Sequence, residues 1–321
     1  MKKIIAFLLV CCVMLALLSG CAGNKDQTEI HIAALKGSTG MGMAKLMADA
    51  PDNYRFALSS DASDVMTKII SGEYDIAALP TNSAAIAYAR TGGEGQVQML
   101  AINTLGVLYL LQRTDETPAE TLSDLRGQTI VAIGQGANPE YVLRFLLEQH
   151  GLTLGDDVTV EWKATVDEVL AAIVAGNCSF AMLPEPNVSV ALSKNSDYSI
   201  AFDLTEEWNA ATVGELVMGC LVVRHGFAQA HPAAVAQFLK DYEASIDFIT
   251  TDDSAPEVIA AQGIVPAEGI ARKALPNCHI VCITGKDMKP AIDAYYEMLF
   301  RANPQAVGGF VPDDGFYYVG K

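Results

Sequence analysis

The chain has 321 residues and a formal net charge of −17 at pH 7, with 38 Asp and Glu residues against 21 Lys and Arg. An acidic surface repels nucleic-acid phosphates and anionic lipid headgroups, so binding to nucleic acid or to a membrane surface is disfavoured. The length and the hydrophobic content of 51% suit one large domain or two lobes of about 100–150 residues each.

The N-terminus carries the pattern of an export signal. Lys2 and Lys3 precede a short apolar run at 4–18, which ends in Leu18-Ser19-Gly20-Cys21. This pattern predicts a cleavable secretory signal over residues 1–20. The ending resembles the bacterial lipobox, which implies that Cys21 is acylated, that 21–28 is a polar tether, and that lipid alone holds the protein on the extracytoplasmic side of the cell envelope. An ordinary secretory signal followed by an unrelated cysteine is the alternative.

Four cysteines remain beyond the lipobox, namely Cys178, Cys220, Cys278 and Cys282. Their spacing matches no disulfide framework, and a strand over 278–283 would hold the last two about 13 Å apart. We therefore expect buried free thiols. No histidine forms a zinc-ligand pattern with them, so we expect no metal and no cofactor.

The chain contains the same α/β unit twice. Each copy reads strand, glycine-rich turn, helix, strand, a second helix ending at a glycine, and a strand closed by a proline. The first copy spans 30–80 and the second 129–184, and the last helix and strand recur with a spacing of 104 residues, from 64–80 to 168–184. Such alternation predicts a parallel sheet flanked by helices in each of two lobes.

Later elements indicate how the lobes are joined. Further elements are expected as strands at 97–103, 106–111, 216–223 and 278–283, and as helices at 232–250 and 285–301. Because no third copy of the unit follows, we expect the C-terminal elements to complete the first lobe. The chain then crosses twice, near 104 and 219, which makes a hinge beside a cleft. The predicted fold class is α/β, with two Rossmann-like lobes: 29–104 plus 220–321 form lobe 1, and 105–219 form lobe 2.

Two short phrases and the plan of the chain resemble a known family. Gly127-Gln128-Thr129-Ile130 and Val222-Val223-Arg224-His225, followed by His231-Pro232, look like type II periplasmic-binding-protein folds. The closest branch serves nitrate, sulfonate, taurine and thiamine-pyrimidine importers, and the resemblance covers about residues 28–301. It implies a monomer that binds a small-molecule ligand in the cleft and delivers it to the permease and ATPase subunits of an ABC importer.

The first glycine-rich turn is a candidate ligand contact. Gly37 and Gly42 satisfy half of a P-loop, but Met43 and Ala44 stand where Lys and Ser or Thr are required, so nucleotide-phosphate chemistry is not supported. What remains is a turn at a helix N-terminus, which favours an anionic or acceptor group. The candidates are Gly37, Ser38, Thr39, Gly40 and Met41. The alternative is a helix cap by Ser38 or Thr39.

The second turn, at 134–139, begins like a dinucleotide fingerprint. Pro139 replaces its third glycine, and Trp162-Lys163 stands where an acidic residue is required, so dinucleotide binding is not supported. Gln135 and Asn138 are candidates by symmetry with the first turn. Asn138 is alternatively an N-cap, with Pro139 in the first helical position.

Strand ends supply the remaining candidates, since open α/β sheets bind ligands at the carboxyl ends of their strands. These are Ser60, Thr81, Asn82, Glu185 and Asn187, with Asn103 and Glu215 near the hinge. Helix capping or a solvated surface is the alternative for each. Glu185 is the sharper candidate, because it is a poorer cap than Thr81 and carries a fixed charge.

These residues indicate a binding protein rather than an enzyme. No Ser/His/Asp set or metal motif has supporting context, and Glu185 has no assigned carboxylate partner. The candidate motifs hold Lys36 as their one cation, so a bare dianion would depend on helix dipoles. We expect a small polar, zwitterionic or heterocyclic solute rather than free sulfate or phosphate. An enzyme of the menaquinone- or pyrimidine-pathway type on the same fold, or a lipoprotein sensor, are the alternative functions.

Overall fold

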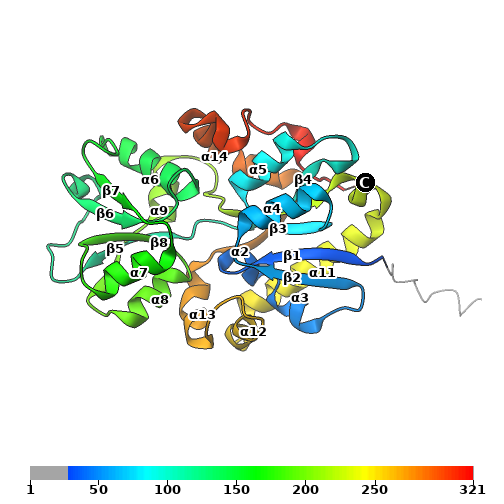
Figure 1. The fold of residues 1–321 in the computed structure, drawn as a ribbon, viewed down its shortest axis with the longest axis horizontal. Helices are drawn as coiled ribbons and strands as arrows, with labels where there is room; N and C mark the ends of the chain where they lie inside the picture. Colours follow the sequence, from blue (N-terminus) through cyan, green and yellow to red (C-terminus); the bar gives the residue numbers. More distant parts are fainter. Residues whose placement is uncertain (1–27, 321) are drawn as a thin grey trace, which may run out of the picture.

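The computed structural model describes residues 28–320 (Figure 1). The predicted signal at 1–20, the lipid site Cys21 and the tether up to residue 27 lie outside the described residues. Among residues 28–320, no helix combines the length and apolar character needed to cross a bilayer.

One lobe is built on a six-stranded sheet in the order β11-β4-β10-β3-β1-β2. Its strands are β1 (Ile30–Leu35), β2 (Tyr54–Ser59), β3 (Ile76–Pro80), β4 (Val97–Thr104), β10 (Gly219–Arg224) and β11 (Ile280–Thr284). β1 pairs parallel with β2 and β3, whereas β10 pairs antiparallel with β3 and β4, and β11 pairs antiparallel with β4.

Helices cover both faces of this sheet. They are α2 (Ser38–Met41), α3 (Ala44–Asp49), α4 (Ala62–Ser71), α5 (Thr81–Arg90), α10 (His225–Ala230), α11 (Pro232–Thr251), α12 (Ala255–Ala261), α13 (Glu268–Ala274) and α14 (Met288–Ala302). α4 packs on α5 and β3, while α3, α11 and α12 pack together; Figure 1 places the two groups on opposite sides of the sheet.

The other lobe has a five-stranded sheet in the order β7-β6-β8-β5-β9. Its elements are β5 (Leu108–Arg113), β6 (Thr129–Ala132), α6 (Asn138–Gln149), β7 (Thr159–Trp162), α7 (Val166–Val174), β8 (Phe180–Pro184), α8 (Asn187–Lys194), β9 (Tyr198–Asp203) and α9 (Leu204–Ala211). β6 pairs parallel with β7 and β8, and β5 pairs antiparallel with β8 and β9.

The two sheets share one plan, as the sequence repeat predicts. Read from one edge, β2-β1-β3-β10-β4 matches β7-β6-β8-β5-β9. The glycines that end the paired helices have left-handed backbone, with φ of 86° at Gly72 and 68° at Gly176, which explains why glycine recurs there. The strands of each repeated unit pair in parallel, as predicted. β10 and β5, the strands that enter each sheet directly after a crossing, run antiparallel to the repeat strands beside them.

Three predicted elements differ from the structure. The single helix expected after the first glycine-rich turn is divided into α2 and α3 around Gly42, where an added Cβ would lie 2.6 Å from the Tyr242 hydroxyl. The strand expected at 216–223 is Gly219–Arg224, and the last strand begins at Ile280, so Cys278 precedes it. The four cysteines in the described part of the chain, Cys178, Cys220, Cys278 and Cys282, are free thiols, and Cys282 is the least buried.

The chain passes between the sheets at two places, close to the positions predicted. β4 ends at Thr104 and β5 begins at Leu108, and the return follows α9 and reaches β10 at Gly219. We propose on this basis that 29–104 with 220–321 form lobe 1 and 105–219 form lobe 2. Both crossings are tightly packed, since a Cβ at Gly106 would lie 2.1 Å from Thr205 Oγ1 and one at Gly219 would lie 2.9 Å from Asn103 Oδ1.

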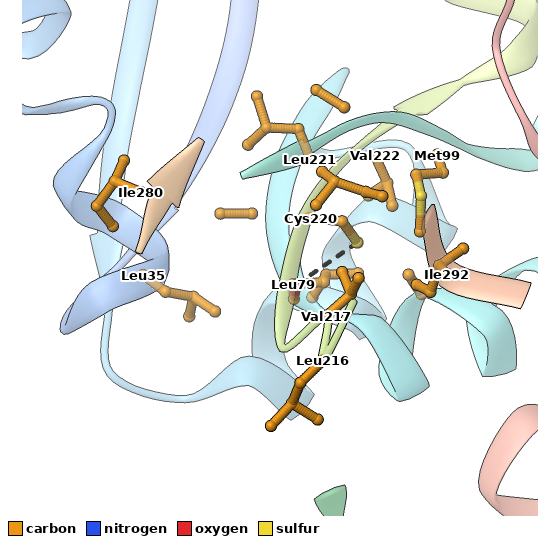
Figure 2. Close-up of a cluster of buried hydrophobic side chains, with 14 of the residues drawn as sticks. Leu35, Leu79, Met99, Leu216, Val217, Cys220, Leu221, Val222, Ile280 and Ile292 are labelled. Carbon is orange, nitrogen blue, oxygen red and sulfur yellow. Dashed lines mark hydrogen bonds between the residues drawn. The ribbon is translucent and has the colours of Figure 1, made fainter. Parts of the chain in front are cut away.

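The core of lobe 1 surrounds β10 and includes the second crossing. Figure 2 shows Val217 close to Leu79 and Cys220, with Leu216 farther along the crossing, and both crossing residues are fully buried. The Cys220 thiol donates to the Leu79 carbonyl at 3.6 Å. Burial of an aliphatic side chain of this size contributes roughly 1.5–3 kcal/mol, so the second crossing is anchored in lobe 1.

Candidate ligand-binding cleft

A cleft of about 450 Å³ lies between the lobes, where the carboxyl ends of β1, β3 and β8 meet. Its volume lies in the usual range for small-molecule sites. Lobe 1 lines it with Lys36, Gly37, Ser38, Thr39, Ala62, Ser63, Met66, Pro80, Asn82 and Ser83, and the other lobe with Val107, Leu108, Ala137, Asn138, Pro139, Pro184, Glu185, Pro186 and Asn187, while Met218 comes from the second crossing.

Four helices of eight residues or more begin at this cleft, two from each lobe. Asp61 caps α4 by accepting the N–H groups of Ser63 and Asp64, and Glu185 accepts an N–H in the first turn of α8. In the described chain, neither α5 nor α6 has a side-chain cap. The Thr81 N–H of α5 donates to the Met218 carbonyl at 3.3 Å, and the Glu140 N–H of α6 donates to the Ala137 carbonyl at 3.1 Å. Each helix end still acts like roughly half a positive charge. The cleft is therefore electropositive between α5 and α6.

Asn138 opens α6 and has an unused hydrogen-bonding atom. It is 3% exposed and lines the cleft, yet its Oδ1 has no hydrogen-bond partner within residues 28–320. It is the first residue of the helix rather than its N-cap, which is Ala137. Glu140 in the same turn is already paired with Arg144 at 2.8 Å. With the amide turned over, Nδ2 would donate to a ligand oxyanion at the start of α6 and so give this buried side chain a partner.

Glu185 is the buried charge of the cleft and is 2% exposed. Its Oε2 accepts the Ser189 N–H at 3.0 Å, and its Oε1 accepts the Ser189 hydroxyl at 3.0 Å and the Asn277 amide at 3.3 Å. Burial raises the pKa of Glu185, while these hydrogen bonds lower it. No cation in the described chain forms an ion pair with it, so the carboxylate is hydrogen-bonded but uncompensated in charge.

The first turn contributes less than its sequence suggests. Gly37 adopts φ of 91° and lines the cleft with Ser38 and Thr39, but α2 has only four residues and so only a small dipole. Gly40 lies beneath the turn, since a Cβ there would lie 1.7 Å from the Leu35 carbonyl oxygen. Met41 is fully buried. Gly40 and Met41 therefore pack the turn rather than line the cleft.

Buried polar side chains hold this turn from behind. Asn103 donates through Nδ2 to the Thr39 carbonyl at 3.0 Å, and the Ser245 hydroxyl donates to the Gly42 carbonyl at 2.6 Å. Both satisfy carbonyl groups at the ends of short helices, which otherwise lack partners. Asn103, 1% exposed, thus supports the turn and does not line the cleft.

The remaining candidates lie outside the lining. The fully buried Thr81 hydroxyl donates to the Val217 carbonyl at 2.7 Å and so ties α5 to the second crossing. Ser60 and Gln135 are exposed, and Glu215 lies on the second crossing, where its N–H donates to the Ala291 carbonyl at 3.0 Å. The cleft brings together seven of the predicted residues: Gly37, Ser38, Thr39, Asn82, Asn138, Glu185 and Asn187.

Sequence reasoning missed several lining residues. Ser63 and Ser83 lie in the first turns of α4 and α5, so the strand-end rule that selected Asn82 could have found them. Met66, Leu108 and Met218 are apolar, and nothing in their spacing separates them from core residues.

A second, larger groove of about 620 Å³ lies between α6, α9 and α14. It is lined by the middle and ends of helices rather than by strand ends. Its arginines are already paired, Arg144 with Glu140 and Arg301 with Glu297, both at 2.8 Å. The interlobe cleft is therefore the candidate ligand site.

The two sheets, the double crossing and the cleft between them define a two-lobed solute-binding protein. The model for the family "ABC transporter, phosphonate, periplasmic substrate-binding protein" matches residues 45–270, so the chain belongs to this family. It is a substrate-binding protein of an ABC transporter. No curated protein matches the chain by sequence.

Solved structures show the same fold. An ABC transporter protein from Parabacteroides distasonis is 23% identical with a TM-score of 0.78, covering 91% of this chain and 99% of that chain. The periplasmic aliphatic sulphonate binding protein of Escherichia coli is 17% identical with a TM-score of 0.71, covering 88% and 90%. The periplasmic nitrate-binding protein of Synechocystis is 11% identical with a TM-score of 0.60, covering 78% and 70%. The two-lobed periplasmic-binding-protein fold predicted from sequence is thus confirmed.

Proposed function

We propose that this substrate-binding protein captures a small zwitterion, with its oxyanion held by the first turns of α5 and α6 and its ammonium group beside Glu185. The observation that carries this is the pairing, in one cleft, of two helix N-termini without side-chain caps and one buried carboxylate without an ion-pair partner. An oxyanion suits the helix ends and an ammonium group suits the carboxylate.

The charges of the cleft favour a zwitterion over a simple anion. Lys36 is the one Lys or Arg among the described residues that line the cleft, and it is exposed. A free dianion would meet about two half charges from α5 and α6 and would be repelled by Glu185. A ligand with both charges satisfies both ends of the cleft. Among the small polar, zwitterionic and heterocyclic solutes expected from sequence, a zwitterion fits best.

A thermal-shift panel tests the ligand class. It compares 2-aminoethylphosphonate and 2-aminoethanesulfonate with ethylphosphonate and ethanesulfonate, which lack the amine, and with inorganic phosphate and sulfate. A ligand at about 100 times its Kd adds about 2.7 kcal/mol to stability, which is readily detected. We expect at least one aminated compound to stabilise the protein more than its amine-free counterpart. Equal shifts, shifts by inorganic anions alone, or no shift with either aminated compound would contradict the assignment.

The cellular setting is part of the same proposal. The protein acts as a lipid-anchored monomer that passes its ligand, chemically unchanged, to an ABC permease driven by an ATPase. The lipobox-like ending at Cys21 supports the anchor, and fractionation of a Cys21→Ala variant checks it, because the variant should leave the membrane fraction. Recovery of a converted ligand after incubation would instead favour an enzyme on this fold.

A further inference from the structure

A short segment between α13 and β11, residues 275–279, contacts both the other lobe and the first crossing. The Tyr109 hydroxyl of β5 donates to the Asn277 carbonyl at 3.0 Å, and the Asn277 side chain donates to Glu185. The Leu105 N–H donates to the His279 carbonyl at 3.1 Å. His279 Nδ1 lies 2.5 Å from the Gly106 carbonyl oxygen and must be the donor, because a carbonyl only accepts.

Asn277 differs from the other hydrogen-bond donors to Glu185. Ser189 donates twice, but it belongs to α8 and moves with the carboxylate. Asn277 reaches Glu185 from the C-terminal half of the chain and does not line the cleft. It therefore affects a ligand through Glu185 and not by contact.

We propose that Asn277 is a positioning residue for ligand capture, which orients the Glu185 carboxylate and ties it to the first crossing. This rests on the proposed function, in which Glu185 binds the ammonium group. Oε1 receives two donors, from Ser189 and Asn277, whereas Oε2 receives one. A carboxylate oxygen accepts about two hydrogen bonds, so the Asn277 bond fills Oε1 and leaves Oε2 to the ligand.

Tyr109 and Cys278 interact electrostatically with Glu185. Burial raises the pKa of the Tyr109 hydroxyl and of the Cys278 thiol, the two groups that face the carboxylate from β5 and from the 275–279 segment. Other ionisable groups lie nearby, namely Asp203 beside Tyr109, His279 in the 275–279 segment and Lys36 in the cleft. The titration is therefore followed at the Glu185 carboxyl carbon itself.

The test follows the Glu185 carboxyl carbon by NMR in ligand-free protein with labelled glutamate, assigned with Glu185→Gln. The variants are Asn277→Leu, which removes the hydrogen-bond donor and keeps the bulk of the side chain, and Asn277→Ala, which removes both. Asn303→Leu is the matched control, because Asn303 donates to Tyr141 of α6 at 3.0 Å and also joins the two parts of the chain. Loss of a donor to the charged form should move the Glu185 titration to higher pH in both Asn277 variants and not in Asn303→Leu.

Binding of 2-aminoethylphosphonate should weaken about tenfold in the Asn277 variants, with little change for ethylphosphonate. An unmoved titration in a folded Asn277 variant, or an equal shift in Asn303→Leu, would overturn the positioning role. If both Asn277 variants fail to fold, the residue is structural and the proposal is likewise overturned. If the Glu185 titration moves in the Asn277 variants but Glu185→Gln binds the aminated compound as tightly as wild type, the Asn277–Glu185 contact is supported. The proposed role of Glu185 in binding the ligand is then rejected.

Discussion

Glu185 Oε2 accepts the backbone N–H of Ser189 at 3.0 Å, so the buried carboxylate of the cleft also stabilises the first turn of α8. From the sequence alone, Glu185 could be either a helix cap or a ligand contact. In the structure the same side chain accepts three hydrogen bonds, two of them at Oε1, and lines the cleft. Its burial without an ion pair has measurable consequences for stability as well as for binding.

The ligand-free protein should lose stability from Glu185 as the pH rises. Burial raises its folded pKa above the unfolded value, so the folded state holds the proton more tightly. This contribution is complete below the unfolded pKa of about 4.3 and is lost as pH rises through the folded pKa. Glu185→Gln should therefore gain stability relative to wild type between about pH 4 and neutrality. Urea denaturation across this window measures it, and a difference that does not change with pH contradicts the assignment.

Asn138→Asp should weaken both stability and binding. A carboxylate at this 3% exposed position, in the same turn as Glu140, loses more through burial than the helix end returns, so the protein should lose about 1–3 kcal/mol of stability. The same charge should repel the ligand oxyanion and weaken 2-aminoethylphosphonate at least about tenfold. Asn209→Asp, on the exposed side of α9, is the control and should leave binding unchanged. Unchanged affinity in Asn138→Asp would remove α6 from the site.

Gly40→Ala should damage the fold rather than block the ligand. The added Cβ would lie 1.7 Å from the Leu35 carbonyl oxygen, and displacing that backbone should cost about 3 kcal/mol. Gly95→Ala, where a Cβ meets nothing within 4 Å, should change stability by less than about 0.5 kcal/mol. Chemical denaturation compares the two variants. Equal stability of the two variants would show that a Cβ at residue 40 fits without displacing the Leu35 carbonyl, which would contradict the structure.

The lobes should close on the ligand about the two crossings. The cleft takes residues from both lobes, and the chain between them is limited to the stretches that contain Gly106 and Gly219. Small-angle scattering should give a smaller radius of gyration with 2-aminoethylphosphonate than without it. A radius that stays constant while calorimetry shows binding would indicate a rigid site.

The repeat explains why much of the fold could be predicted. Gly72 and Gly176 each need left-handed backbone at a helix end, and each is followed by a buried strand, so periodicity and glycine placement carry the architecture. The antiparallel direction of β5 and β10 could not be predicted in this way. It depends on where the chain enters the other sheet, which local pattern does not specify.

The candidate site was predictable in position but less so in side-chain direction. The strand-end rule located the turns, yet it could not distinguish Asn82, which lines the cleft, from Thr81, whose hydroxyl bonds to Val217. Asn277 gave no signal at all, because its partner Glu185 lies 92 residues away and the contact exists only in the folded protein.

The central claim is that Glu185 binds the ammonium group of the ligand. Calorimetry with an aminated compound and its amine-free counterpart tests this claim most directly. Binding of 2-aminoethylphosphonate and ethylphosphonate is measured for wild type, for Glu185→Gln and for Glu257→Gln, an exposed control on α12. We expect wild type and the control to prefer the aminated compound by about tenfold or more, and Glu185→Gln to lose that preference while still binding ethylphosphonate. A preference that survives unchanged in Glu185→Gln, or that is absent from wild type, would contradict the account.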